Sequence, residues 1–330
     1  MDLVIHTEQL ARSFTTRKET VHAVTGVDID VARGELVAFL GPNGAGKSTT
    51  LRMLTTLLPP TSGAAWVAGA SVTDQPALVR SRIGYIGQGD GAGHSFRVVD
   101  ELVSQGRFYG MNGSDAKTRA ADLVGILDLK GLETRRVSTL SGGQRRRLDI
   151  ALGLMHRPSL IFLDEPSTGM DPQNRANLWE HIGRLREREE TTIVLTTHYL
   201  EEADAQAERV LVIDHGAIIA DDRAENLKMR LAGDLITLTV GPPDEPATRQ
   251  VLGLAGTELQ SVPTALGTAV SGRFPQGSRT LPGLLRRLDA DGVDVRAASV
   301  AVPTLDDVFL HLTGRSLREE QTAVPESQAA

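Results

Sequence analysis

The chain has 330 residues, a length that suggests about two domains at roughly 100 to 200 residues per domain. Hydrophobic residues make up 40% and charged residues 23%, which argues against intrinsic disorder, a collagen-like chain or a coiled coil. The formal net charge of -7 opposes non-specific attraction to nucleic acid or to an anionic lipid surface, so a role at a membrane would require a protein partner.

The composition also limits the location and the kinds of site that we expect. Cysteine is absent from the sequence, which excludes a disulfide framework, a thiolate metal site and a cysteine nucleophile. The longest uncharged window, residues 53–73, contains prolines, glycines and many polar residues, and does not predict a membrane-spanning helix. The N-terminal MDLVIHTEQL has acidic residues where a secretion signal requires basic ones. We therefore expect a cytoplasmic protein.

Strand-like and helical segments alternate over the first two thirds of the chain, which predicts an α/β fold. Residues 36–40 predict a short apolar strand, followed by the turn GPNGAGKS and then by a helix. The turn fits the pattern G-x-x-x-x-G-K-[ST], in which backbone N–H groups cradle phosphates, the lysine reaches them and the last hydroxyl binds Mg²⁺. The alternative is a glycine-rich turn without a ligand. The predicted phosphate-binding residues are Gly41, Pro42, Asn43, Gly44, Ala45, Gly46, Lys47, Ser48 and Thr49.

Two further apolar runs, residues 160–163 and 192–196, are typical of buried strands in a parallel sheet, and residues 115–128 and 174–185 have helical spacing. The first run ends in Asp164 and Glu165. Acids at the carboxyl end of a strand face the crevice of an open α/β sheet. Asp164 would hold Mg²⁺ and Glu165 would polarise the attacking water, although two such acids can also cap the next turn.

The last third of the chain predicts a separate domain. Residues 209–213 and 217–220 predict a β-hairpin, and the composition changes after Gly233. We expect residues 234–316 to form a small α+β domain that ends in a helix at 305–312, and residues 317–330 to form a flexible polar tail.

The motif LSGGQ at residues 140–144 lies between the phosphate-binding turn and the strand that ends in Asp-Glu. By this order of motifs the chain resembles the ATP-binding-cassette (ABC) ATPases. The resemblance implies a P-loop NTPase cassette over residues 1–233, with a mainly parallel sheet core and a helical signature subdomain. The remaining chain, including PTLDDVF at 303–309, is similar to the ATP-binding subunits of daunorubicin/doxorubicin-resistance exporters.

The resemblance implies further site residues. Phe14 stands where the family places an aromatic residue that stacks on adenine, with a core phenylalanine as the alternative. Gln88 resembles the glutamine that touches Mg²⁺ or water and senses the membrane subunit. His198 resembles the switch histidine that contacts the γ-phosphate. Asp171 matches the D-loop acid, in a segment, TGMD, that departs from the family's usual SALD.

The signature residues Ser141, Gly142, Gly143 and Gln144 would open a helix running to Leu154 and form a second anion site. In the family this site closes over ATP bound to the opposite subunit, so a single cassette implies a dimer with two shared ATP sites. The adjacent arginines at 145–147 predict a solvated helix face or an exposed rim of the dimer, because nearby Asp149 and the overall acidity disfavour nucleic-acid binding. The glycine-rich stretch 89–94 and Arg97 depart from the family pattern at the face that contacts the membrane subunit.

Together these features predict an ATP-hydrolysing subunit with ATP and Mg²⁺ as cofactors. It would work as a homodimer or paired cassette, at the cytoplasmic face of the membrane, and would energise a separate transmembrane permease that exports a hydrophobic drug or antibiotic. The export direction rests on the C-terminal resemblance. The alternatives are an importer subunit, or a soluble ABC ATPase acting on DNA or the ribosome; the soluble class generally has two cassettes or a long coiled-coil insertion.

Overall fold

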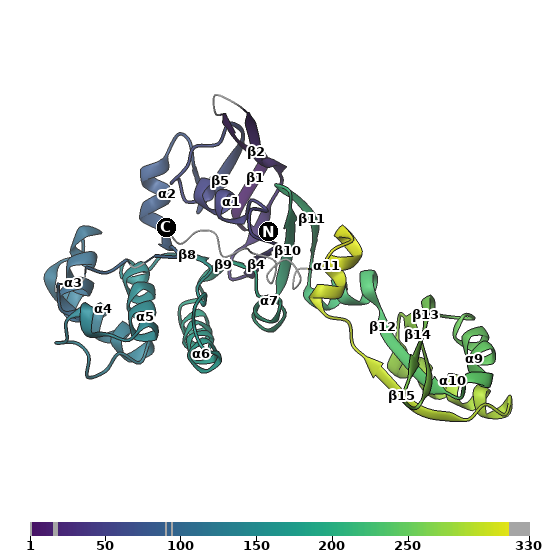
Figure 1. The fold of residues 1–330 in the computed structure, drawn as a ribbon. Helices are drawn as coiled ribbons and strands as arrows, with labels where there is room; N and C mark the ends of the chain where they lie inside the picture. Colours follow the sequence, from purple (N-terminus) through teal and green to yellow (C-terminus); the bar gives the residue numbers. More distant parts are fainter. Residues whose placement is uncertain (1, 16–18, 90, 94, 317–330) are drawn as a thin grey trace. The chain divides into compact units, whose positions relative to one another are not determined.

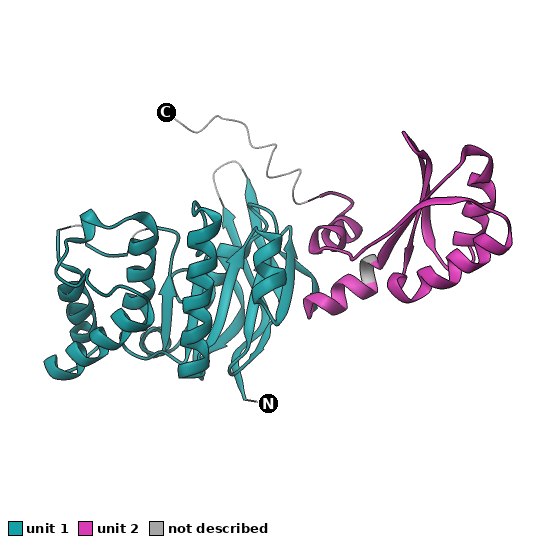
Figure 2. Ribbon diagram, turned by 90° about the horizontal axis from the view of Figure 1, so that it is seen from below, with its two compact units in different colours: residues 1–221 teal, residues 222–330 magenta. Residues whose placement is uncertain are grey.

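The computed structural model describes residues 2–15, 19–89, 91–93 and 95–316, and the chain divides into two compact units, residues 1–221 and 222–330 (Figure 2). Each unit has a hydrophobic core of its own. The predicted tail at 317–330 lies outside the described residues. Among the helices of the described ranges, none is both long and apolar enough to cross a bilayer.

The larger unit is built around a six-stranded sheet in the order β11-β10-β4-β9-β8-β7 (Figure 1). From β10 to β7 the neighbouring strands run parallel, and β4, β8 and β9 are buried along their whole length. Continuous apolar runs form such strands because a parallel sheet is covered on both faces. The predicted strands and hairpin are therefore confirmed. The sheet consists of β4 (Leu36–Leu40), β7 (Ile83–Ile86), β8 (Leu160–Asp164), β9 (Thr192–Thr197), β10 (Arg209–Asp214) and β11 (Ala217–Asp222).

A second, antiparallel sheet in this unit was not predicted as a separate layer. Helix α1 (Lys47–Leu54) contacts strands of both sheets, and its Leu51 and Leu54 are fully buried in a core that also contains Phe39 and Phe162. This packing holds the start of α1 at the carboxyl end of β4. The second sheet consists of β1 (Leu3–Thr15), β2 (Thr20–Val27), β3 (Asp30–Ala32), β5 (Ser62–Val67) and β6 (Ala70–Ser71).

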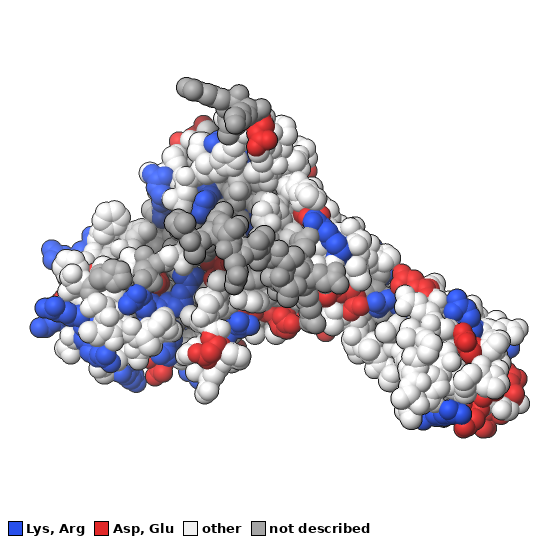
Figure 3. Space-filling view, viewed as in Figure 1, with Lys and Arg blue, Asp and Glu red and all other residues white. Residues whose placement is uncertain are grey.

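Three helices, α3 (Val98–Phe108), α4 (Gly113–Ile126) and α5 (Gly142–Leu154), pack together as a helical subdomain, over which basic side chains gather in Figure 3. The predicted helix at 115–128 is α4. It ends earlier than expected because Asp128 has a left-handed backbone, with a φ of 51°. Arg119 of α4 is buried and forms a bidentate ion pair with Glu189 at the end of α6. The other helices are α2 (Pro76–Arg82), the 3₁₀ turn η1 (Val137–Thr139), α6 (Pro172–Glu189) and α7 (Leu200–Gln206).

The smaller unit contains an antiparallel sheet in the order β13-β14-β12-β15, in a β-α-β-β-α-β arrangement. Period-two alternation in β12 buries Ile236, Leu238 and Val240 beneath α9 and α10. Helix α11 packs instead on α8 and the π-helical turn η2. These elements are α8 (Ala224–Leu227), η2 (Lys228–Ala232), β12 (Asp234–Val240), η3 (Pro242–Asp244), α9 (Glu245–Leu252), β13 (Thr257–Thr264), β14 (Gly267–Phe274), α10 (Gly277–Ala290), β15 (Val295–Ala301) and α11 (Leu305–Thr313).

Candidate functional site

The predicted phosphate-binding turn joins β4 to α1 and requires its glycines. Gly44 and Gly46 have φ values of 81° and 105°, and a Cβ on Gly46 would lie 2.5 Å from the carbonyl oxygen of Ala23. The side chain of Lys47 is buried at the start of α1, where its Nζ donates to the carbonyl oxygens of Gly41, at 2.7 Å, and Pro42, at 2.9 Å. Burial lowers the pKa of Lys47, and the nearby carboxylates of Glu165 and Asp164 oppose this shift. The turn therefore combines a buried ammonium with a helix N-terminus, as an anion site requires.

A cation site lies beside this turn. Asp164 ends β8 and is buried, and its Oδ1 accepts hydrogen bonds from Ser48 Oγ at 2.9 Å and Thr196 Oγ1 at 2.7 Å. Its Oδ2 is buried and has no hydrogen-bond partner among the described residues. A buried carboxylate oxygen without a partner, next to a hydroxyl, fits a hard divalent cation such as Mg²⁺, which binds through one or two carboxylates and the phosphates of its substrate. Ser48 and Asp164 are thus brought together as predicted.

Glu165 and His198 form the part of the site that can accept a proton. Glu165 has a left-handed backbone with a φ of 47°, and its N–H donates to the carbonyl oxygen of Thr196. Its Oε2 lies 3.3 Å from Nδ1 of His198 and accepts a hydrogen bond from Thr168 Oγ1 at 3.1 Å. The interaction with His198 is the largest cause that lowers the pKa of Glu165, and burial opposes it. The carboxylate is therefore ionised near neutral pH, as a general base must be.

A cleft of about 370 Å³ in the larger unit brings together three of the segments assigned by resemblance, and its lining includes neither Phe14 nor His198. Gln88, which is exposed after β7, borders the cleft, as do Glu165 and Asp171. Of the described residues that line it, none belongs to the phosphate-binding turn. The lining residues are Gln88, Gly89, Ser141, Gly142, Gly143, Arg146, Asp149, Glu165, Pro166, Thr168, Gly169, Met170, Asp171 and Asn174.

Two of these residues also begin helices. Ser141 is the N-cap of α5, and it forms a capping box in which its backbone N–H donates to Gln144 Oε1 at 3.0 Å. The predicted helix from Gln144 to Leu154 therefore starts at Gly142. Asp171 is the N-cap of α6 and accepts a hydrogen bond from the backbone N–H of Asn174 at 2.9 Å. The hydrogen bonds from Asn174 lower the pKa of Asp171.

Phe14 lies at the end of β1 with 39% of its surface exposed. The alternative of a core phenylalanine is therefore wrong. The guanidinium carbon of Arg12 lies 4.8 Å from the centre of the Phe14 ring, so a cation interacts with the ring.

The prediction of a solvated face for the arginines at 145–147 is wrong for Arg146, which is 9% exposed. Its guanidinium donates to backbone carbonyl oxygens of two neighbouring loops, at Gly87 and Pro166. A run of three arginines gives no sign of this burial, because it depends on loops that are distant in sequence.

Sequence reasoning also missed Glu202. Its buried carboxylate accepts hydrogen bonds from Ser167 Oγ, from Thr197 Oγ1 at 2.9 Å and from Trp179 Nε1 at 3.3 Å. This single side chain connects the segment after Glu165 to the strand before His198. Its position within the acidic run Glu201, Glu202 favours an exposed helix start, so the sequence contains no signal that singles it out.

Comparison with known proteins identifies the family. A family model for ABC transporters matches residues 24–168. The daunorubicin/doxorubicin resistance ATP-binding protein DrrA of Streptomyces peucetius is 40% identical over 306 residues, covering 91% of this chain and 90% of that protein. The chain belongs to the family of ABC transporter ATP-binding proteins. A second relative of this family, the linearmycin resistance ATP-binding protein LnrL of Bacillus subtilis, is 33% identical over 303 residues, covering 92% of this chain and 96% of that protein.

Solved structures agree with this fold. The ABC cassette MJ0796, in a dimeric post-hydrolysis state bound to ADP and Pi, has a TM-score of 0.61 at 23% identity, covering 66% of this chain and 98% of that chain. The ABC transporter component cbiO1 of Clostridium perfringens has a TM-score of 0.63 at 23% identity, covering 76% of this chain and 95% of that chain. The predicted ABC cassette is confirmed, and the protein is an ATP-hydrolysing ATPase subunit of a transporter.

Proposed function

We propose that this ABC ATPase energises the export of a hydrophobic drug or antibiotic through a separate transmembrane permease. The observation that carries the catalytic half of the proposal is the geometry around Asp164 and Glu165, where a buried carboxylate oxygen without a partner lies beside Ser48 and an ionised base lies beside His198. The names of the relatives, which are resistance ATP-binding proteins, support the class of the exported compound.

In this mechanism each residue has one task. Lys47 and the start of α1 bind the β- and γ-phosphates of ATP, and Phe14 stacks on the adenine. Ser48, Asp164 and Gln88 would hold Mg²⁺, which neutralises charge on the phosphates when it is bound. Glu165 accepts the proton of the attacking water, while His198 holds Glu165 in place and contacts the γ-phosphate.

Two copies of the chain would complete each ATP site. By the resemblance to the family, the signature residues would act on the nucleotide of the partner copy; the cleft that they line also contains Gln88 and Glu165. ATP would close the pair by adding contacts that exist only in the closed form, and hydrolysis would remove them. The pair would bind the permease at the cytoplasmic face of the membrane.

The decisive experiment uses a candidate permease, recognised as a chain with about six apolar runs of roughly 20 residues each. We expect the two proteins to co-purify and, in lipid vesicles, to show ATP hydrolysis that is stimulated by hydrophobic drugs such as anthracyclines. The matched control is the same complex with Glu165→Gln, which should assemble but not hydrolyse ATP. A verified complex whose ATPase rate is unaffected by a panel of hydrophobic compounds would contradict drug export.

A further inference from the structure

The backbone on both sides of Gln88 is held by side chains of one helix, α5. The segment 87–93 follows β7. Its described residues contact α5 in two ways, through a backbone carbonyl oxygen and through backbone N–H groups. Arg146 binds the backbone of Gly87, directly before Gln88, and Asp149 binds the backbone of Gly91 and Ala92, three and four residues after it. These two residues lie three positions apart, so they project from the same face of α5. We refer to Arg146 and Asp149 together as the α5 clamp.

Arg146 connects three segments through backbone carbonyl oxygens. Its Nη1 donates to Gly87 at 2.6 Å, its Nε to Pro166 at 2.9 Å and its Nη2 to Asp164 at 3.4 Å. A planar guanidinium presents several N–H groups in a fixed geometry, so one side chain can reach carbonyl groups on two loops at once. The signature helix, the segment before Gln88 and the loop around Glu165 are thereby joined by one buried side chain.

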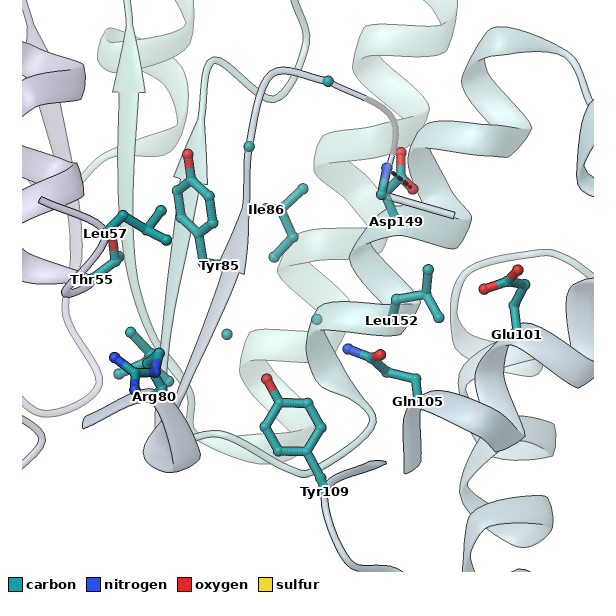
Figure 4. A pocket seen from close by; sticks show the side chains of 16 residues that line it. Thr55, Leu57, Arg80, Tyr85, Ile86, Glu101, Gln105, Tyr109, Asp149 and Leu152 are labelled. Carbon is teal, nitrogen blue, oxygen red and sulfur yellow. Dashed lines mark hydrogen bonds between the residues drawn. The ribbon is translucent and has the colours of Figure 1, made fainter. Parts of the chain in front are cut away.

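Asp149 holds the other side of the segment. The backbone N–H groups of Gly91 and Ala92 both donate to its Oδ1, at 3.0 Å and 3.1 Å, and Asp149 is only 6% exposed. Figure 4 shows the carboxylate beside this loop, with a dashed line for a hydrogen bond. A Cβ on Gly91 would lie 3.2 Å from that oxygen, so a glycine permits the close approach.

Glu101 of α3 makes a similar contact farther along the segment. Its Oε1 accepts a hydrogen bond from the backbone N–H of Gly93 at 3.1 Å, and a Cβ on Gly93 would lie 2.6 Å from the same oxygen. The glycines of this stretch therefore allow acidic side chains of the helical subdomain to bind bare backbone. This accounts for the glycines at positions 91 and 93.

We infer that Arg146 and Asp149 are positioning residues that fix Gln88 to the signature helix, so that the two move as one unit during the ATP cycle. The inference rests on the function proposed above for its use of Gln88. A displacement of α5 toward a partner's nucleotide would carry Gln88 with it, and a displacement of Gln88 would be transmitted to Ser141 through the same helix. Neither residue of the clamp touches the reacting atoms.

The first test measures the contact itself, in the full chain without nucleotide. In Asp149→Ala, hydrogen–deuterium exchange at the amides of Gly91 and Ala92 should become faster by roughly tenfold or more, because both lose a charged acceptor. Asp149→Asn keeps an acceptor oxygen and should exchange at an intermediate rate. The matched control is Asp128→Asn. It removes an exposed carboxylate that pairs with Arg147 of α5, and it should leave the exchange rates of both amides unchanged. Unchanged exchange in Asp149→Ala would overturn the clamp.

The second test separates positioning from stability. We expect Asp149→Ala and Arg146→Lys to lower kcat about tenfold with the KM for ATP within about twofold, because ATP still binds to an intact phosphate turn. In a Gln88→Ala background, Asp149→Ala should lower kcat no further, because the clamp acts through Gln88. If the effects of Gln88→Ala and Asp149→Ala on kcat add up, the inference is overturned. It is also overturned if kcat is unchanged in a variant whose loop amides exchange faster. If the unmodified chain does not turn over ATP, the proposed function is contradicted instead. The exchange measurement would then still show whether Asp149 holds the backbone of Gly91 and Ala92.

Discussion

At the scale of single residues, Lys47 illustrates how the site is prepared for its ligand. Its ammonium is buried, yet it is satisfied by two carbonyl oxygens of its own turn, so the charge does not depend on bound phosphate for its hydrogen bonds. When phosphate binds, its oxygens would replace the two carbonyl oxygens as hydrogen-bond acceptors. The ammonium is already removed from water, so no further desolvation of the lysine is needed. The affinity for ATP should therefore depend strongly on this one side chain.

We predict that Lys47→Ala abolishes nucleotide binding or turnover, since it removes the charge that faces the phosphates while the sheet stays intact. Binding of a fluorescent ATP analogue and phosphate release would measure the loss. Lys117→Ala, at an exposed position of α4, is the matched control and should change neither. A folded Lys47→Ala protein with normal ATP affinity and rate would contradict the assignment.

Glu165→Gln should retain ATP binding but lower hydrolysis by roughly 100-fold or more, because an amide cannot accept the proton of the attacking water. The ATP-bound closed dimer should then accumulate. Gel filtration with Mg-ATP measures this, and a protein that elutes only as a monomer would remove the main support for shared sites.

His198→Ala should raise the pKa of Glu165, because the interaction with His198, whose Nδ1 lies 3.3 Å from the Glu165 Oε2, is the largest cause that lowers this pKa. The folding stability should change as well. A carboxyl whose pKa is lowered in the folded state stabilises the fold above its unfolded pKa, and this contribution is lost as the pH falls from the unfolded pKa to the folded pKa. In His198→Ala the contribution should be smaller, and its loss should be complete at a higher pH. An NMR titration of the Glu165 carboxyl carbon tests the direction, with His215→Ala, an exposed histidine, as control. An unmoved titration would show that His198 does not act on Glu165.

At the scale of elements, Asp171 caps the start of α6 and also matches the D-loop acid of the family. Asp171→Ala should lower the melting temperature, because the orphan N–H of Asn174 loses its acceptor. Asp171→Asn keeps an acceptor oxygen and should restore the melting temperature. If the carboxylate also acts across the dimer, Asp171→Asn should melt normally but hydrolyse ATP more slowly. Equal ATPase rates for Asp171→Asn and the unmodified chain would limit Asp171 to capping.

The elements also show which features a sequence can reveal. Strands β4, β8 and β9 are predictable because each is a continuous apolar run buried on both faces, and the motifs mark the loops at their carboxyl ends. The contact of Asp164 with Ser48 follows from the edge of the sheet that the carboxyl ends of these parallel strands share, although β9 lies between β4 and β8. Thr196 could be inferred only from the register that places it opposite Asp164. Arg146 and Glu202 could not, because their burial arises from loops that meet only in the folded chain.

At the scale of the whole molecule, the shared-site arrangement can be tested by mixing. Ser141→Arg should block hydrolysis while leaving ATP affinity of the monomer nearly intact, because it obstructs a site used by the partner. A heterodimer of this chain with one carrying Lys47→Ala should recover one working site, made of the phosphate turn of the first and the signature of the second. Homodimers of each variant are the controls. No recovery in verified heterodimers would argue against action between chains.

The α5 clamp has a consequence for how this protein tolerates mutation over time. Arg146 and Asp149 bind backbone carbonyl oxygens and amides of the loop, which almost every residue provides. These backbone contacts can therefore persist when side chains of the loop change to suit a different permease. Substitutions at Gly91 or in the clamp itself would break the attachment. We expect relatives that share this arginine and aspartate to retain a small residue at 91.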